Sequence, residues 1–394
     1  MLKKISSLLI ITLSFSCGSD NDSEYVPVET YPNVTAAFGD NINLSNLANY
    51  ANQTVPAYIT KNNTGSNLIT DKGATLGRVL FYDKKLSSNN TISCASCHQQ
   101  ANGFSDIAIS SQGVNGTTGR HSMRLINNRF ANETKFFWDE RAINLETQTT
   151  MPIKDHGEMG YSGTNGDEAF SGLITKLSAI GYYKELFKFV YGSEEITENK
   201  MQLALAQFIK SIQSFDSKYD AGRALAANEG QPFTNFTTQE NQGKNLFLTP
   251  PVFDATGNRT SGGLGCAGCH AAPEFDIDPN SLSNGIGGSI AGGADFTNTR
   301  APSLRDIAKP DGTPNGPMMH TGVITTLQAA IGHYGNLTTA AINNTNLDPR
   351  LKPNGFGQQL HLTAPEVNAV IAFLKTLSGT NVYTDSKWSN PFLN

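Results

Sequence analysis

The sequence predicts a mainly α-helical fold made of two similar lobes with long loops. Three observations predict it. The motif Cys-x-x-Cys-His occurs twice, beginning at Cys94 and at Cys266. A segment of the form Gly-x-x-Leu-Phe precedes each copy, at 77–81 and at 243–247. Convincing alternating strands are few, whereas Gly, Asn, Thr and Ser are frequent between the helical patterns.

Composition excludes some classes of partner. The chain has 394 residues, 38% of them hydrophobic, which suits two or three domains with cores of their own. Its formal net charge is −5, and it contains no basic tract. We therefore expect no nucleic acid partner.

The N-terminal residues 1–17 have the pattern of a lipoprotein-type signal peptide. Lys3 and Lys4 precede an apolar run at 5–15 that is too short to cross a bilayer. Cys17 directly follows the small Ser16, so we predict that Cys17 becomes a lipidated N-terminus; the alternative is ordinary cleavage nearby that discards Cys17. Residues 18–45 are polar and are predicted to be a flexible linker. The chain should be exported, to the periplasm or as an outer-membrane lipoprotein of a Gram-negative bacterium, touching membrane only through this lipid.

Each Cys-x-x-Cys-His motif predicts a covalently bound haem c. The two thiols can form thioethers with the two vinyl groups of one porphyrin, and the adjacent His can supply the proximal nitrogen of the iron. A single motif could also be a redox dithiol or half of a zinc site. Two copies, with only one further cysteine in the chain, favour two haems. The expected attachment and ligand residues are Cys94, Cys97 and His98, and Cys266, Cys269 and His270.

The repeat predicts two cytochrome c-like lobes, at 46–215 and at 216–394. Each copy reads as a short helix, a loop and a haem-binding turn, and Thr237 with Glu240 forms a capping box before the second such helix. Helical spacing of apolar residues predicts a core helix at 201–215. A second capping box at Thr363 opens an amphipathic helix that ends at Gly379. The last helix of the chain can pack back on the first lobe.

A series of blocks in fixed order resembles the bacterial di-haem cytochrome c peroxidase and MauG family. The resemblance covers about residues 70 to 380 and rests on the two haem motifs and on the blocks 76–83, 137–142, 148–159, 302–305, 320–327 and 371–375. It implies that the first lobe meets hydrogen peroxide and that the second lobe relays electrons. It also implies a small electron-donor protein, such as a monohaem cytochrome c or a cupredoxin. Family members are often homodimers, although the sequence carries no separate signal for a dimer.

The resemblance also implies roles for several residues of the first lobe. Glu158 matches the distal acid–base, and Gln148 matches the distal amide. A carboxyl group suits this role, because partial burial raises its pKa toward the working pH. Trp138 matches the tryptophan between the two haems. Arg141 is expected to contact a haem propionate through its planar guanidinium.

The loop after the first haem motif departs from the pattern of typical peroxidases. Those proteins carry a His there that caps the resting iron, whereas the matching loop at 110–116 contains none. His121 follows, in the place of an Asn, and is not expected to be a cap. His156 could reach the pocket, but a surface position is the better interpretation. We therefore expect the first haem to be open at rest, as in MauG-type members.

The second haem shows another departure. Counting along the matching block places Tyr334 where typical peroxidases carry an axial Met, and MauG-type members have a Tyr there. Leu327, Ile331 and Tyr334 share one helical face, so Tyr334 can point toward the core. The alternative is that Tyr334 only packs and that His333, Met318 or Met319 is the ligand.

The family further implies a Ca²⁺ between the lobes, and the matching positions are Asn127, Asn315 and Pro317. Oxygen ligands of this kind suit Ca²⁺.

The leading interpretation is thus a di-haem peroxidase that reduces hydrogen peroxide to water. One alternative is a MauG-type oxidase that modifies a protein substrate. Another is a di-haem electron carrier without catalysis. Glu158 and Gln148 favour an enzyme over a carrier.

Overall fold

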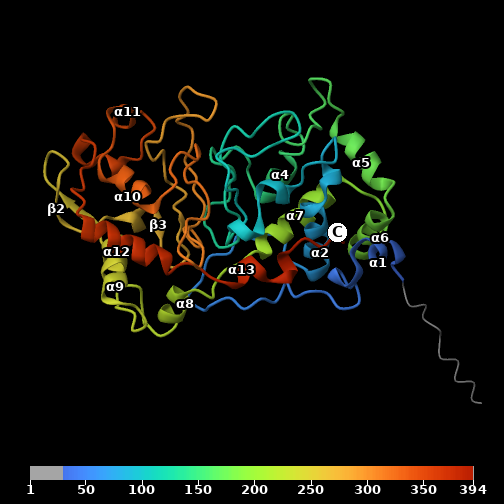
Figure 1. Cartoon of the computed structure of the whole chain (residues 1–394), viewed down its shortest axis with the longest axis horizontal. Helices are drawn as coiled ribbons and strands as arrows, with labels where there is room; N and C mark the ends of the chain where they lie inside the picture. Colours follow the sequence, from blue (N-terminus) through green and yellow to red (C-terminus); the bar gives the residue numbers. More distant parts are fainter. Residues whose placement is uncertain (1–29, 394) are drawn as a thin grey trace, which may run out of the picture.

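Two helical lobes lie side by side in the computed structural model, which describes residues 30–393 (Figure 1). The predicted signal peptide, Cys17 and the linker residues 18–29 lie outside this range. Long loops from both lobes face each other in the middle of the molecule. Within residues 30–393, no helix has both the length and the apolar character that crossing a bilayer requires. The mainly α, two-lobed fold with long loops is as predicted.

The first lobe is built from seven helices among the described residues. They are α1 (Pro32–Phe38), α2 (Asp71–Tyr82), α3 (Cys94–Cys97), α4 (Leu145–Thr150), α5 (Phe170–Ser178), α6 (Gly181–Tyr191) and α7 (Glu198–Ser211). The predicted helix at 201–215 is therefore α7, and it ends four residues earlier than expected. The chain leaves the helix there because the carbonyl of Ile212 accepts from the backbone N–H of Asn127, at 3.0 Å.

The second lobe repeats this plan and adds two small hairpins. Its helices are α8 (Lys218–Arg223), α9 (Thr238–Leu248), α10 (Leu327–Gly335), α11 (Thr339–Ile342) and α12 (Ala364–Lys375). The antiparallel strand pairs are β1 (Pro251–Phe253) with β2 (Arg259–Gly262), and β3 (His270–Ala271) with β4 (Asp276–Ile277). Both predicted capping boxes are present, at the start of α9 and of α12. Helix α12 ends at Lys375, before Gly379.

A close helix crossing forms the centre of each lobe. Helix α2 packs against α7, and α9 packs against α12. A Cβ atom at Gly77 would lie 2.0 Å from the carbonyl oxygen of Ala204, and one at Gly243 would lie 1.9 Å from that of Ala369. Glycine thus lets the two backbones touch. The repeat seen in the sequence therefore extends to the partner helices.

The N-terminal segment corrects one prediction. Residues 18–45 were expected to form a flexible linker, but Pro32–Phe38 is a helix whose Val34 and Phe38 are buried in the first core. Ile42 is buried in the same core. Val34 and Phe38 are four apart and share one face of α1, whereas Ile42 lies just beyond the helix. Burial of this apolar face outweighs the polar composition of the segment.

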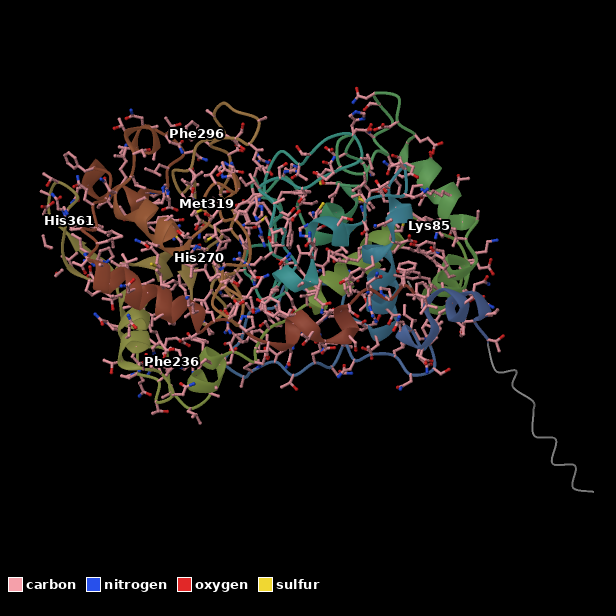
Figure 2. The ribbon with its side chains drawn as sticks, viewed as in Figure 1. Lys85, Phe236, His270, Phe296, Met319 and His361 are labelled. Atoms are coloured by element: carbon pink, nitrogen blue, oxygen red, sulfur yellow. The ribbon has the colours of Figure 1, made fainter. Side chains whose placement is uncertain are left out.

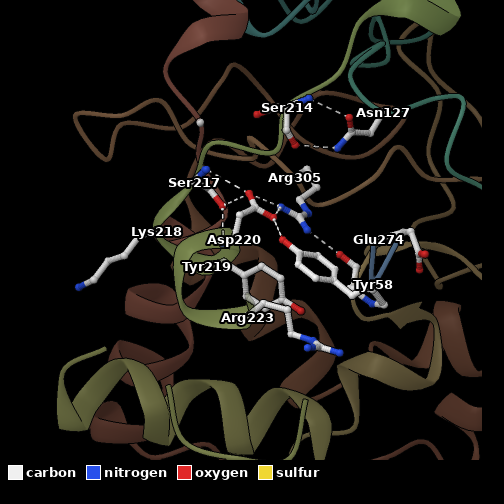
Figure 3. Close-up of polar contacts among 12 residues, drawn as sticks. Tyr58, Asn127, Ser214, Ser217, Lys218, Tyr219, Asp220, Arg223, Glu274 and Arg305 are labelled. Carbon is white, nitrogen blue, oxygen red and sulfur yellow. Dashed lines mark hydrogen bonds and ion pairs between the residues drawn. The ribbon is translucent and has the colours of Figure 1, made fainter. Parts of the chain in front are cut away.

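A buried ion pair joins several segments of the second lobe (Figure 3). Arg305 is fully buried and donates to both carboxylate oxygens of Asp220, at 2.8 and 2.9 Å. The hydroxyls of Tyr58 and Ser217 donate to the same carboxylate. The second guanidinium nitrogen of Arg305 donates to the carbonyl of Pro273, at 2.8 Å. The ion pair thus connects α8 and the segment after the second haem motif to the loop segment around Tyr58.

The end of the chain returns from the second lobe to the first (Figure 1). Helix α13 (Asn381–Thr384) packs on the short turn Gln100–Asn102 that follows the first motif. Val382 and Trp388 are buried in the core of the first lobe. Arg78 of α2 donates to the carbonyl of Ser389, at 2.7 Å. The return segment therefore fixes one lobe relative to the other.

Candidate active site

The first motif lies on α3, a single helical turn. Ser93 and Ser96 form a capping box around the first cysteine. His98 follows, and its Nδ1–H donates to the carbonyl of Phe104, at 3.1 Å. This bond fixes the ring and leaves Nε2 as the nitrogen that would meet an iron, the usual arrangement for a metal-bound His. Desolvation lowers the pKa of His98, which favours the neutral, ligating form.

The second motif has the same local design. Cys266 opens the turn Cys266–Gly268, and His270 begins β3. Burial lowers the pKa of His270 to about 4, while the backbone of Phe275 acts in the opposite direction. Phe104 and Phe275 have the same left-handed φ of 56°. The two loops therefore turn at corresponding residues, but Nδ1 of His270 is buried without a hydrogen-bond partner, whereas Nδ1–H of His98 donates to Phe104.

A cavity of about 550 Å³ lies beside the second motif. Its wall is mostly apolar and includes Cys266, Cys269 and His270 on one side and Met319 and Tyr334 on others. Figure 2 shows His270 and Met319 in the interior of this lobe. The volume falls within the range of about 300–1,000 Å³ typical of cofactor pockets. Two thiols, an imidazole and an apolar wall fit a covalently attached haem.

The structure separates the candidates for the second axial ligand. Tyr334 lines the cavity, as do Met318 and Met319. The amide of Asn284 donates to the Tyr334 hydroxyl at 3.3 Å and to the Met319 sulfur at 3.2 Å. His333 instead bonds through Nε2 to the carbonyl of Asn284, at 2.8 Å. Tyr334 and the two methionines can thus face a haem, whereas the His333 ring is engaged elsewhere.

Glu158 lies beside the first motif. Burial raises the pKa of the Cys94 and Cys97 thiols, and the nearby carboxyl group of Glu158 adds to this rise. Burial is the main cause that raises the pKa of Glu158; with the added effect of Asp155 and the opposing effect of Arg141, this pKa is about 7. A half-buried carboxyl group with this pKa can both accept and donate a proton near neutral pH.

Gln148 lies half-buried on α4, and α4 leads directly into the loop that carries Glu158. The side chain of Asn144 caps this helix by accepting from Thr147 N, at 2.8 Å. Helix α4 packs against α7. The amide therefore has a rigid support next to the loop of Glu158.

The loop at 110–116 packs on the Glu158 loop. Val114 N donates to the Glu158 carbonyl, at 3.0 Å, and Asn115 N donates to the Gly157 carbonyl, at 3.2 Å. The His121 ring is buried, and its nitrogens bond to the Ala108 carbonyl and the Ser105 hydroxyl. The His156 ring bonds to Asp167, at 2.9 Å. Both histidines are thus engaged by protein groups.

Trp138 lies at the junction of the lobes. Its indole N–H donates to the carbonyl of His121, at 2.7 Å, and its ring meets that of His320 edge-on, with centroids 6.3 Å apart. Trp138 also lines the cavity of the second motif. The guanidinium of Arg141 pairs with Asp139, at 2.8 Å, and stacks on Phe137. The indole thus connects segments next to both motifs, and the propionate contact of Arg141 stays a prediction.

The residues expected to bind calcium have different surroundings. Both ends of the Asn127 amide bond to the backbone of Ser214. The amide nitrogen of Asn315 donates to the carbonyl of Asp306, while its Oδ1 is buried without a protein partner. Pro317 lines the cavity of the second motif. Asn315 therefore offers a free buried oxygen, and Asn127 is already engaged.

Sequence reasoning missed residues that act on the predicted ones. Asn284 lies in a Gly- and Asn-rich loop, and no local pattern distinguishes it from its neighbours. Asp155 is a loop acid that no local sequence pattern relates to Glu158. Phe104 and Phe275 could have been found, because each follows its motif at nearly the same distance.

Comparison with known proteins gives a consistent result. A family model described as di-haem cytochrome c peroxidase matches residues 71–228. The chain is 27% identical over 326 residues to the methylamine utilization protein MauG of Methylophilus methylotrophus, covering 80% of this chain and 84% of the relative. It is 28% identical over 321 residues to the cytochrome c551 peroxidase of Nitrosomonas europaea, covering 78% of this chain and 80% of the relative.

Solved structures have the same architecture. A MauG-like protein associated with microbial copper homeostasis is 26% identical, with a TM-score of 0.65 over 86% of this chain and 99% of its own. The diheme peroxidase BthA of Burkholderia thailandensis shares the fold at 20% identity, with a TM-score of 0.58 over 83% of this chain and 92% of its own. The two motifs, the fitting cavity and these matches agree on an oxidoreductase with two haem c groups. Residues 71–228 thus match the di-haem cytochrome c peroxidase family, and most of the chain is similar to MauG proteins and cytochrome c peroxidases.

Proposed function

We propose that the protein reduces hydrogen peroxide to water with electrons from a small redox protein, such as a monohaem cytochrome c or a cupredoxin. The observation that carries the proposal is Glu158, a half-buried carboxyl group beside the first motif with a pKa raised to about 7. Each turnover takes one H₂O₂, two electrons and two protons and yields two waters. The donor supplies the two electrons, and bound haem would supply the redox chemistry that passes them to the peroxide.

The protein residues move protons and hold the substrate. As a carboxylate, Glu158 accepts a proton from the inner oxygen of the peroxide and returns it to the outer oxygen, which leaves as water. Gln148 orients the peroxide by hydrogen bonding. In this proposal the first lobe is peroxidatic, the second accepts electrons from the donor, and Trp138 couples them.

The test is steady-state consumption of H₂O₂ with a reduced cytochrome c as donor. Glu158→Gln keeps the shape of the side chain but cannot accept the proton, so turnover should fall about 10²–10⁴-fold, the usual contribution of acid–base help. Both haems should stay bound, as seen by absorption. Glu168→Gln is the matched control, because this exposed carboxyl group lies on a nearby segment. Wild-type turnover in Glu158→Gln would show that Glu158 is not the acid–base group. No turnover in the native protein would leave an electron carrier without catalysis.

A second candidate function is a MauG-type oxidation of a protein substrate. It is favoured by Tyr334, which lines the cavity beside the second motif. An anionic oxygen ligand should lower the potential of that haem relative to Met and stabilise its higher oxidation states. Tyr334→Phe should then alter the low-spin EPR signal of the second haem, whereas Met319→Leu should not. The reverse result would make Met319 the ligand.

We also propose a Ca²⁺ between the lobes, held by one Asn side chain and by backbone oxygens at the positions Asn127, Asn315 and Pro317. The support is the unpartnered Oδ1 of Asn315. Elemental analysis should find one calcium per chain, and Asn315→Ala should lose it. A calcium-free native protein would exclude the site.

Export with a lipid on Cys17 completes the proposal, since haem c is attached outside the cytoplasm. A labelled fatty acid should be incorporated into the native protein and not into Cys17→Ser. A homodimer remains an option that solution molecular mass would decide.

A further inference from the structure

Asp155 shapes the turn that carries Glu158. Its side-chain Oδ1 accepts the backbone N–H of Glu158, at 3.0 Å. Its backbone carbonyl accepts from Met159 N, at 3.2 Å, and from Gly160 N, at 2.8 Å. The three bonds close the segment 155–160 on Asp155. The side chain of Asp155 is exposed, whereas that of Glu158 is half-buried.

The other side of the same turn is held by the loop at 110–116. Besides the bonds from Val114 and Asn115 backbone N–H groups, the Asn115 amide donates to the His156 carbonyl, at 3.0 Å. The contact is so close that a Cβ atom at Gly113 would lie 2.1 Å from the Gly157 oxygen. The backbone of the turn at Glu158 is therefore held from two directions, by Asp155 and by the loop at 110–116.

The charges that face Glu158 come from different elements. Asp155, on its own turn, is negative, and Arg141, on the segment after Trp138, is positive. The thiols of Cys94 and Cys97, on α3, are neutral, since burial raises their pKa to about 12 and about 11. As thioethers they would also carry no charge. Asp155 is thus the negative neighbour that opposes ionisation of Glu158.

We propose that Asp155 is a positioning residue for Glu158: its carboxylate accepts the backbone N–H of Glu158 and holds the turn that carries this side chain. Burial is the main influence that disfavours the charged form of Glu158, and the negative charge of Asp155 adds to it. The inference rests on the proposed function, in which the carboxylate form of Glu158 accepts the peroxide proton. The fraction of that form sets the rate on the acid side of the pH profile.

Asp155→Asn separates charge from shape, because Asn keeps an oxygen that can accept from Glu158 N. The acid limb of kcat/KM for H₂O₂ should move to lower pH by on the order of half a pH unit, as expected for one partly solvated neighbouring charge. The plateau should stay within about twofold of the native value, since the acid–base group itself is intact. Asp155→Ser, whose hydroxyl also accepts, repeats the test if the Asn variant does not accumulate. Arg141→Gln should move the limb in the opposite direction.

Asp167→Asn is the matched control. This carboxylate pairs with His156 on the same side of the lobe, and it should leave the limb in place. An unmoved limb in Asp155→Asn, with Glu158→Gln inactive and both haems bound, would overturn the inference while leaving the proposed function intact. Equal pH shifts in Asp155→Asn and Asp167→Asn would also overturn the inference. They would show that the shift comes from the overall charge of the region and not from the contact between Asp155 and Glu158. An active Glu158→Gln would instead remove the acid–base role of Glu158, and a native protein without H₂O₂ turnover would remove the proposed function.

Discussion

At the scale of the residue, opposing influences set the pKa of Glu158. Burial and Asp155 disfavour its charged form, and Arg141 favours it. The balance leaves a pKa of about 7, whereas an exposed glutamate titrates near 4.3. A carboxyl group of this kind is ionised over only part of the physiological pH range, which suits proton exchange in both directions.

The pH dependence of activity follows from this balance. The carboxylate is the form that accepts the peroxide proton, and a raised pKa means that it accumulates only as pH rises through about 7. We therefore expect kcat/KM for H₂O₂ to rise with pH through that region and to be low at pH 5. Steady-state rates from pH 5 to pH 9 at saturating donor check this. A profile that is flat across this range would mean that Glu158 is not the titrating base.

At the scale of the element, each lobe depends on a glycine at a helix crossing. Helices α2 and α7, and α9 and α12, approach until backbone touches backbone. The same device in both lobes explains why the Gly-x-x-Leu-Phe segments are repeated in the sequence.

Gly243→Ala should therefore destabilise the second lobe. Its Cβ would lie 1.9 Å from the Ala369 oxygen, so the helices must separate. We expect a loss of about 1–3 kcal/mol, the usual range for an overpacked core, measured as a lower free energy of unfolding in urea. Gly332→Ala in α10 is the control, because open space surrounds that position and its stability should not fall. An unchanged free energy of unfolding in Gly243→Ala would show that α9 and α12 can move apart without loss of stability.

The loop at 110–116 leads to a prediction about the resting state. It offers no nitrogen ligand of its own, it is bonded to the Glu158 turn, and the His121 ring is engaged by protein groups. The ferric protein should therefore be high-spin at the first haem and react with stoichiometric H₂O₂ without prior reduction. Stopped-flow absorption tests this by the rapid loss of the high-spin signal. A protein that is inert until reduced by one electron would reveal a missed ligand, with His121 and His156 the first to examine.

At the scale of the whole molecule, several contacts fix the two lobes together. Arg120 of the first lobe pairs with Asp295 of the second, at 2.9 Å. Trp388, on the segment that returns from the second lobe, is buried in the core of the first lobe, and its indole N–H donates to the Ser211 hydroxyl. The segment around Tyr58 reaches Asp220 in the second lobe. These contacts hold Trp138 and the two motifs in one arrangement.

Asp220→Ala should weaken this arrangement. It leaves the guanidinium of Arg305 fully buried without its partner, which typically costs about 3–5 kcal/mol. Urea unfolding followed by far-UV circular dichroism measures the loss. Asp278→Ala is the comparison, because its ion pair with Arg350 is partly exposed and should contribute at most about 1 kcal/mol. Equal losses of unfolding free energy in both variants would show that the buried Asp220–Arg305 pair stabilises the protein no more than the partly exposed pair does.

The sequence by itself determined what depends on covalent and local chemistry. Cysteine and histidine spacing predicted both haem attachments, and capping residues placed the starts of α9 and α12. Tertiary structure alone decided which residues are buried and which side chains face the candidate site. Contacts between distant segments bury Val34 and Phe38, turn His333 away from the cavity and set Asp155 against Glu158. Burial and electrostatic neighbours depend on how loops meet in space, and spacing along one chain does not specify that meeting.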